Sequence, residues 1–137
     1  GLALGQFSEL RQGEIRYALD QIKFLPWVDA SNIVLAGYSE GGGAVRDFPA
    51  KQPEINGVMT FGVGCRGGIN ASNDVHVFTV LGDQDRYLIG VMSFSTCDAL
   101  GHAAPSRAWT VPKGGHDIMS ELPVQTEITK MLIAWKR

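Results

Sequence analysis

The most informative part of the sequence is Ile33-Val34-Leu35-Ala36-Gly37-Tyr38-Ser39-Glu40-Gly41. Its first four residues form a short apolar run, which is typical of a strand buried on both faces of a sheet. The Gly-x-Ser-x-Gly spacing that follows is typical of a sharp turn that presents a serine at the top of a sheet and then opens a helix. We expect a side chain at either Gly37 or Gly41 to collide with the neighbouring strand or helix. The stretch therefore predicts a strand, a tight turn carrying Ser39, and a helix.

The rest of the chain alternates between helical and strand-like patterns, with Pro26 expected to stop the first helix and Pro49 the second. Strands that alternate with helices imply a parallel sheet with helices on both faces. The sequence predicts a single α/β domain over residues 1–137, with a parallel sheet of about four strands in a three-layer arrangement. Helices are expected at 7–25, 41–48, 86–100 and 120–135, and strands at 32–36, 57–63, 75–81 and 107–111.

Three polar residues that could carry chemistry follow predicted strands directly. Ser39 follows the first strand, Asp85 the third and His116 the fourth. Ligands bind at the carboxyl ends of parallel strands, so these side chains are expected to meet. Together they would form a catalytic triad in which Ser39 attacks a carbonyl, His116 takes its proton and Asp85 orients the imidazole.

Other interpretations of these residues stay open at the level of sequence. Ser39 could simply cap the following helix, and His116 could be a surface loop residue. Asp83 is the rival of Asp85 for the acid, and either aspartate could be a turn residue. The Glu40 backbone N–H, at the start of the predicted helix, is the natural first donor to an oxyanion.

Composition excludes several other functions. The chain carries a net charge of −2, and its Lys and Arg residues form no stripe, so a nucleic-acid partner is not indicated. No apolar run approaches the roughly 18 residues that span a bilayer, and no spacing predicts a metal or cofactor site. The two cysteines, Cys65 and Cys97, could pair in a secreted protein, but free thiols are favoured, and with them a cytoplasmic location slightly over a secreted one.

Residues 29–44 resemble the strand, turn and helix passage of the α/β-hydrolase superfamily. The doubled glycine Gly42-Gly43 is similar to dienelactone hydrolases and to the catalytic domains of prolyl-oligopeptidase-like enzymes, and residues 82–85 and 115–116 are similar to the acid and histidine loops of the superfamily. The resemblance implies a serine esterase that acts without a cofactor on a small ester or acyl substrate.

The resemblance covers the chain from about Phe7 onward, and it corresponds to the C-terminal part of the family fold. Members usually have several strands and a helix ahead of that part, and an early loop supplies a second oxyanion donor. We therefore expect the strand at 32–36 to be a sheet edge, covered by a second copy or by a further N-terminal segment. The alternative function is a weakly active or non-catalytic module of hydrolase fold with a binding or structural role.

Overall fold

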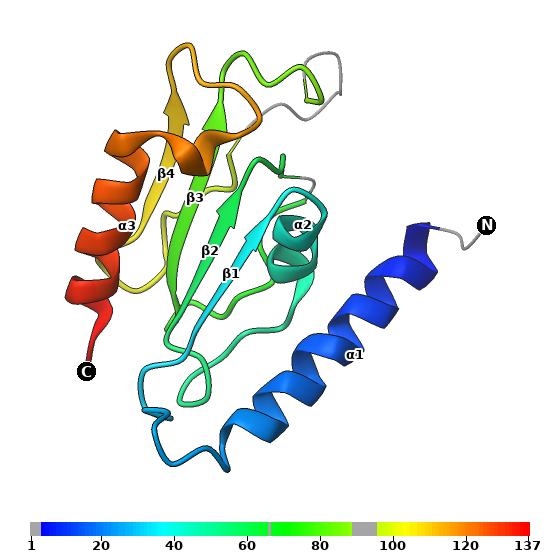
Figure 1. Ribbon diagram of the computed structural model, residues 1–137, viewed down its shortest axis with the longest axis vertical. Helices are drawn as coiled ribbons and strands as arrows, with labels where there is room; N and C mark the ends of the chain where they lie inside the picture. Colours follow the sequence, from blue (N-terminus) through cyan, green and yellow to red (C-terminus); the bar gives the residue numbers. More distant parts are fainter. Residues whose placement is uncertain (1–3, 66, 89–95) are drawn as a thin grey trace.

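The computed structural model describes residues 4–65, 67–88 and 96–137. They form a sheet of four parallel strands in the order β1-β2-β3-β4, flanked by helices (Figure 1). This arrangement confirms the predicted α/β class. The strands are β1 (Val34–Tyr38), β2 (Gly57–Phe61), β3 (His76–Gly82) and β4 (Arg107–Val111), and the helices are α1 (Leu4–Ile22), α2 (Glu40–Asp47), the 3-10 turn η1 (Ile118–Ser120) and α3 (Leu122–Trp135).

The sheet lies between two helical layers, with α1 and α2 on one side and α3 on the other (Figure 1). Alternate residues of the central strands face opposite layers, so Val58 packs with α1 and α2 whereas Met59 packs with α3. Each layer has its own core of buried side chains. The first core includes Leu19, Val45, Phe48, Val58 and Val77, and the second includes Met59, Phe61, Phe78, Val124, Met131 and Trp135.

Several predicted boundaries differ from those in the structure. Helix α1 ends at Ile22, ahead of Pro26, because the chain leaves it through turns in which Phe24 N and Leu25 N each bond the carbonyl three residues back at 3.1 Å. Pro26 therefore does not stop the helix as expected. Residues 86–88 form a turn and residues 96–100 are not helical, so both described ends of the helix expected at 86–100 contradict it. Residues 89–95 lie outside the described residues.

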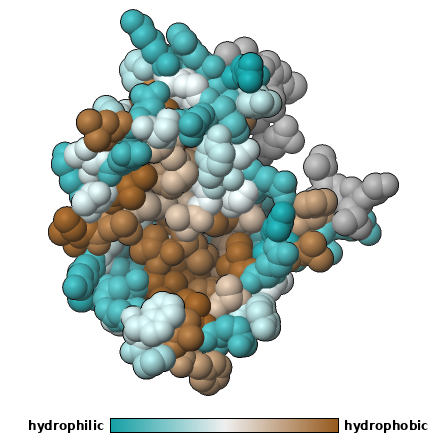
Figure 2. Space-filling model, in the orientation of Figure 1, coloured by the Kyte–Doolittle hydropathy of each residue, from teal (hydrophilic) through white to brown (hydrophobic). Residues whose placement is uncertain are grey.

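Strand β1 is the edge of the sheet, as expected, but it is not buried on both faces as its apolar run predicted. All of β2 is buried, whereas Ala36 and Tyr38 in β1 are exposed. Figure 2 shows apolar residues gathered between α3 and α1 on this side of the molecule. A hollow of about 540 Å³ beside the start of β1 is lined by residues including Leu19, Ile22 and Ile33, and it lies away from Ser39. The burial expected of an interior strand is missing because β1 has a neighbouring strand on one side alone among the described residues.

No helix in the described part of the chain is both long and apolar enough to span a membrane.

The free edge of β1 has a measurable consequence. The Ile33 carbonyl accepts a bond from Asn56 N, and Ser39 N donates to Phe61 O, so the odd-numbered residues of this stretch face β2. The N–H groups of the even-numbered residues Val34, Ala36 and Tyr38 therefore point away from the sheet. We predict that these three amides exchange with solvent much faster than those of Leu35 and Gly37, as measured by hydrogen exchange and NMR. Slow exchange at all three would mean that another strand covers the edge, and dependence on protein concentration would identify that strand as a second copy.

Candidate active site

Ser39 occupies a strained turn between β1 and α2. Its backbone has φ 53° and ψ −120°, a region that residues other than glycine rarely adopt and that costs of order 1–3 kcal/mol. The turn is held by two backbone bonds, from Ser39 N to Phe61 O at 2.8 Å and from Gly43 N to Ser39 O at 3.0 Å. The Ser39 side chain makes no capping bond to α2. The interpretation of Ser39 as a helix cap is therefore wrong.

The glycines around Ser39 differ in what they contribute to the turn. A Cβ on Gly37 would lie 2.2 Å from the Gly41 carbonyl oxygen, so glycine is required there. A Cβ on Gly41 would meet nothing within 4 Å, which contradicts the prediction for that position. The crowding falls instead on Gly42, where a Cβ would lie 2.9 Å from Val63 Cγ1 and 3.0 Å from the Gly37 carbonyl oxygen. A side chain on Gly41 would therefore point into open space.

The structure brings Ser39, His116 and Asp85 together in a chain of hydrogen bonds. His116 Nε2 lies 3.0 Å from Ser39 Oγ, and His116 Nδ1 lies 2.6 Å from Asp85 Oδ2. Asp85 is fully buried, whereas the His116 side chain keeps 21 % of its exposure. A carboxylate bonded to one ring nitrogen leaves the other able to accept a proton from the hydroxyl.

Asp83, the rival acid, lies elsewhere. Its carboxylate accepts a bond from Lys113 N at 2.6 Å, and its side chain is exposed. Asp85 faces inward because its second oxygen accepts the Tyr87 N–H at 3.0 Å, which fixes the carboxylate against the turn that carries it. The aspartate that contacts His116 is therefore Asp85.

Two further glycines, which sequence analysis did not single out, make room for His116. The imidazole comes from the loop after β4 and must reach Ser39 past the end of β2. There, a Cβ on Gly62, which has φ +63°, would lie 3.2 Å from the His116 carbonyl oxygen and 3.4 Å from His116 Cε1. A Cβ on Gly82 would lie 2.1 Å from the Gly114 carbonyl oxygen in the same loop. The sequence signal for both was a glycine directly at a strand end.

A pocket of about 490 Å³ opens beside Ser39 and His116. This volume lies in the range of small-molecule sites. The four charged side chains in its lining pair with one another. Arg11 Nε lies 3.2 Å from Glu40 Oε1, and Arg46 Nε lies 2.6 Å from Asp47 Oδ1. The apolar part of the lining is formed by Phe7, Ala44, Val63 and Leu88.

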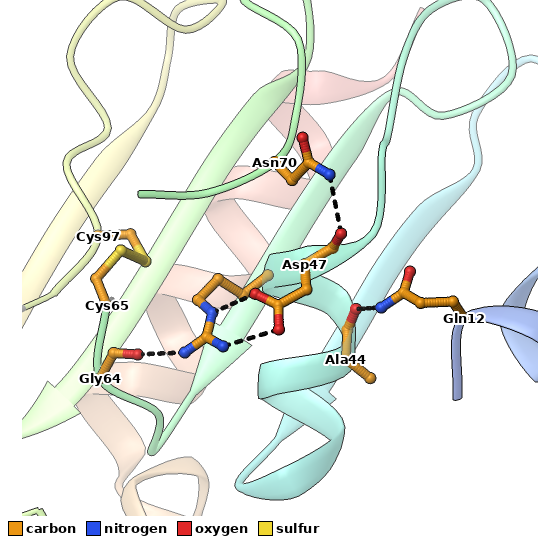
Figure 3. Close-up of polar contacts among 8 residues, drawn as sticks. Gln12, Ala44, Asp47, Gly64, Cys65, Asn70 and Cys97 are labelled. Atoms are coloured by element: carbon orange, nitrogen blue, oxygen red, sulfur yellow. Dashed lines mark hydrogen bonds and ion pairs between the residues drawn. A yellow bond between two sulfur atoms is a disulfide. The ribbon is translucent and has the colours of Figure 1, made fainter. Parts of the chain in front are cut away.

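Arg46 and Asp47, at the C-terminal end of α2, line this pocket, and Figure 3 draws the polar contacts around Asp47. The Arg46 guanidinium also donates to Gly64 O at 2.8 Å, in the loop after β2. On the other side, Asn70 Nδ2 donates to Asp47 O at 3.0 Å (Figure 3). These contacts join α2 to the loop that carries Val63.

Cys65 and Cys97 form a disulfide, so the expectation of free thiols is wrong (Figure 3). Their Cα atoms lie 4.8 Å apart although 32 positions separate them in the chain. The bond ties the loop after β2, next to Gly64, to the segment after the acid loop. Cys65 lies two residues after Val63, which lines the pocket.

The charges around the site also act on Tyr38, the residue before Ser39. Partial burial, followed by the negative charges of Asp117 and Asp85, raises the pKa of Tyr38 above its ordinary value. Tyr38 therefore remains a neutral phenol at physiological pH. Glu40 begins α2, so its backbone N–H is one of those at the helix start that no turn of the helix can satisfy.

Comparison of the sequence with protein-family models and with curated proteins gives no match. Any function must therefore be inferred from the geometry of the described residues.

The glycine contacts predict opposite effects for two substitutions. Gly37→Ala should destabilise the fold by about 3 kcal/mol or more, because the new methyl group meets backbone that cannot move aside. Gly41→Ala should be neutral or stabilising by up to about 1 kcal/mol, because it adds a better helix former in open space. Urea unfolding of both variants measures the two free energies. Equal destabilisation by the two changes would contradict the role given to the Gly37 contact.

Proposed function

We propose that this protein is a serine hydrolase of the α/β-hydrolase type that cleaves carboxylic esters through an acyl-serine intermediate. The observation that carries the proposal is the continuous relay from Ser39 Oγ to His116 to the buried Asp85. Acyl transfer by a serine uses these three groups: the serine as nucleophile, the histidine as its base, and the aspartate to orient the histidine. The strained backbone of Ser39 adds support, since strain of this kind gathers at functional sites.

The chemistry would proceed in two halves. Ser39 Oγ attacks the ester carbonyl carbon while His116 Nε2 takes the hydroxyl proton, and Asp85 stabilises the imidazolium. The Glu40 N–H faces the oxyanion that develops on the carbonyl oxygen. Collapse of this intermediate expels the alkoxide, which receives the proton from His116, and leaves the acyl group on Ser39. Water then attacks the acyl-serine with His116 again as the base, which frees the acid.

The pocket supports an uncharged substrate. Its charged lining residues are already paired, and the pairing of Arg11 with Glu14 and Glu40 raises the Arg11 pKa further, so this guanidinium stays charged. A charged ligand would have to break one of these pairs, whereas a small neutral ester needs only the apolar part of the lining and the relay.

One observation favours the alternative of a weakly active or non-catalytic module. Ser39 follows the edge strand β1, and no strand among the described residues lies on its outer side. In the family that the sequence resembles, an early loop ahead of this part of the fold supplies the second oxyanion donor. A site that has the Glu40 N–H as its one donor would lose about 100- to 1000-fold in rate. The two functions differ in turnover, which the next experiment measures together with serine reactivity.

We predict that Ser39→Ala abolishes both labelling by a fluorophosphonate and hydrolysis of p-nitrophenyl butyrate, because the attacking oxygen is gone. Ser31→Ala is the matched control, since Ser31 is an exposed serine ahead of β1 that does not line this pocket, and it should keep both activities. Labelling and turnover in the unchanged protein, both lost in Ser39→Ala, would support the esterase. Labelling without turnover would favour the weakly active module. Full activity in Ser39→Ala would end the proposal.

A second pair of variants tests the acid. Asp85→Asn should lower kcat by about 10⁴-fold, because an amide at this buried position favours the wrong imidazole tautomer. Asp83→Asn should leave kcat nearly unchanged, since its carboxylate bonds Lys113 N rather than His116. Steady-state kinetics on the same ester gives both values. A larger loss in Asp83→Asn than in Asp85→Asn would refute the assignment of the acid.

A further inference from the structure

The His116 imidazole contacts two tyrosine rings as well as its hydrogen-bond partners. The ring centroid of Tyr87 lies 4.6 Å from that of His116, with the planes inclined by 58°. The ring centroid of Tyr38 lies 5.1 Å away, with the planes inclined by 46°. Tyr38 is part of the strand that leads into Ser39, whereas Tyr87 belongs to the turn that carries Asp85.

Tyr87 is unusual because its ring packs on the imidazole while it remains 61 % exposed. A large aromatic residue in such a position adds little to the core, and its other ring contact in the described chain is with the Arg86 guanidinium, 5.4 Å from the ring centroid. Its backbone is held closely, because Tyr87 N donates to Asp85 Oδ1 at 3.0 Å. One carboxylate therefore orients the imidazole through Oδ2 and places the tyrosine through Oδ1.

We propose that Tyr87 is a positioning residue for the triad, whose ring holds the His116 imidazole in the orientation that bridges Ser39 and Asp85. The kinetic part of this proposal rests on the hydrolase function proposed above. The structural part, that the ring immobilises the imidazole, stands on the contacts alone.

The imidazole needs such support because two side-chain torsions set its direction. Its bond to Ser39 Oγ, at 3.0 Å, borders an open pocket, where water can compete for it. An aromatic ring packed against the imidazole removes rotational freedom and excludes water from the Nδ1 bond to Asp85. A displacement of about 1 Å at reacting groups can cost 100-fold in rate, so a loose imidazole would be a slow base.

The experiment compares Tyr87→Ala, Tyr87→Phe and the unchanged protein, with Tyr17→Ala as a control for loss of an exposed tyrosine on α1. KM is measured on p-nitrophenyl butyrate, together with three quantities that report on the imidazole: kcat on the same ester, the inactivation rate with phenylmethanesulfonyl fluoride, and the NMR signal of the proton on His116 Nδ1. We expect Tyr87→Ala to lose about 10- to 100-fold in kcat and in inactivation rate and to lose the Nδ1 proton signal through exchange with water. Tyr87→Phe and Tyr17→Ala should keep all three.

The outcomes distinguish a positioning role of Tyr87 from a substrate contact. A rise in KM alone, with kcat, inactivation and the proton signal unchanged in Tyr87→Ala, would overturn the proposal and make Tyr87 a substrate contact. Loss of all three in Tyr87→Phe as well would also overturn it, because the ring would not be the cause. If the unchanged protein shows neither turnover nor inactivation, the hydrolase function fails, and the proton signal still decides whether Tyr87 holds the imidazole.

Discussion

The close approach of the Gly37 and Gly41 backbones is the constraint on which the rest of the site depends. It lets the chain reverse from β1 into α2 within a few residues, and the reversal forces Ser39 into a left-handed backbone conformation. The Ser39 side chain then projects from the carboxyl edge of the sheet instead of capping the helix. A methyl group on Gly37 would separate the two backbones and move the hydroxyl away from His116.

The parallel strands place the other two members of the relay at the same edge of the sheet as Ser39. Because β1 to β4 are all parallel, Ser39, Asp85 and His116 emerge at the same edge although β2 and β3 separate the outer strands. His116 reaches Ser39 only past the end of β2, where Gly62 leaves room for it. The same loop packs on Gly82, which brings the imidazole to the buried carboxylate of Asp85.

The charged groups in and around the relay have partners. The charges that line the pocket are paired with one another. The relay itself contains one buried carboxylate, which the imidazole and a backbone N–H satisfy. Buried charges are stable when they are paired in this way.

Features that depend on neighbouring residues could be predicted from the sequence. Apolar runs and glycines predicted the four strands, the turn at Ser39, and the acid and histidine loops, because the backbone preferences behind these features act over a few positions. Features that depend on residues far apart came from the structure alone: that Ala36 and Tyr38 of β1 are exposed, that Cys65 pairs with Cys97, and that Gly42 and Gly62 rather than Gly41 are crowded. Burial and steric contact are properties of packed neighbours, and a linear pattern does not contain them.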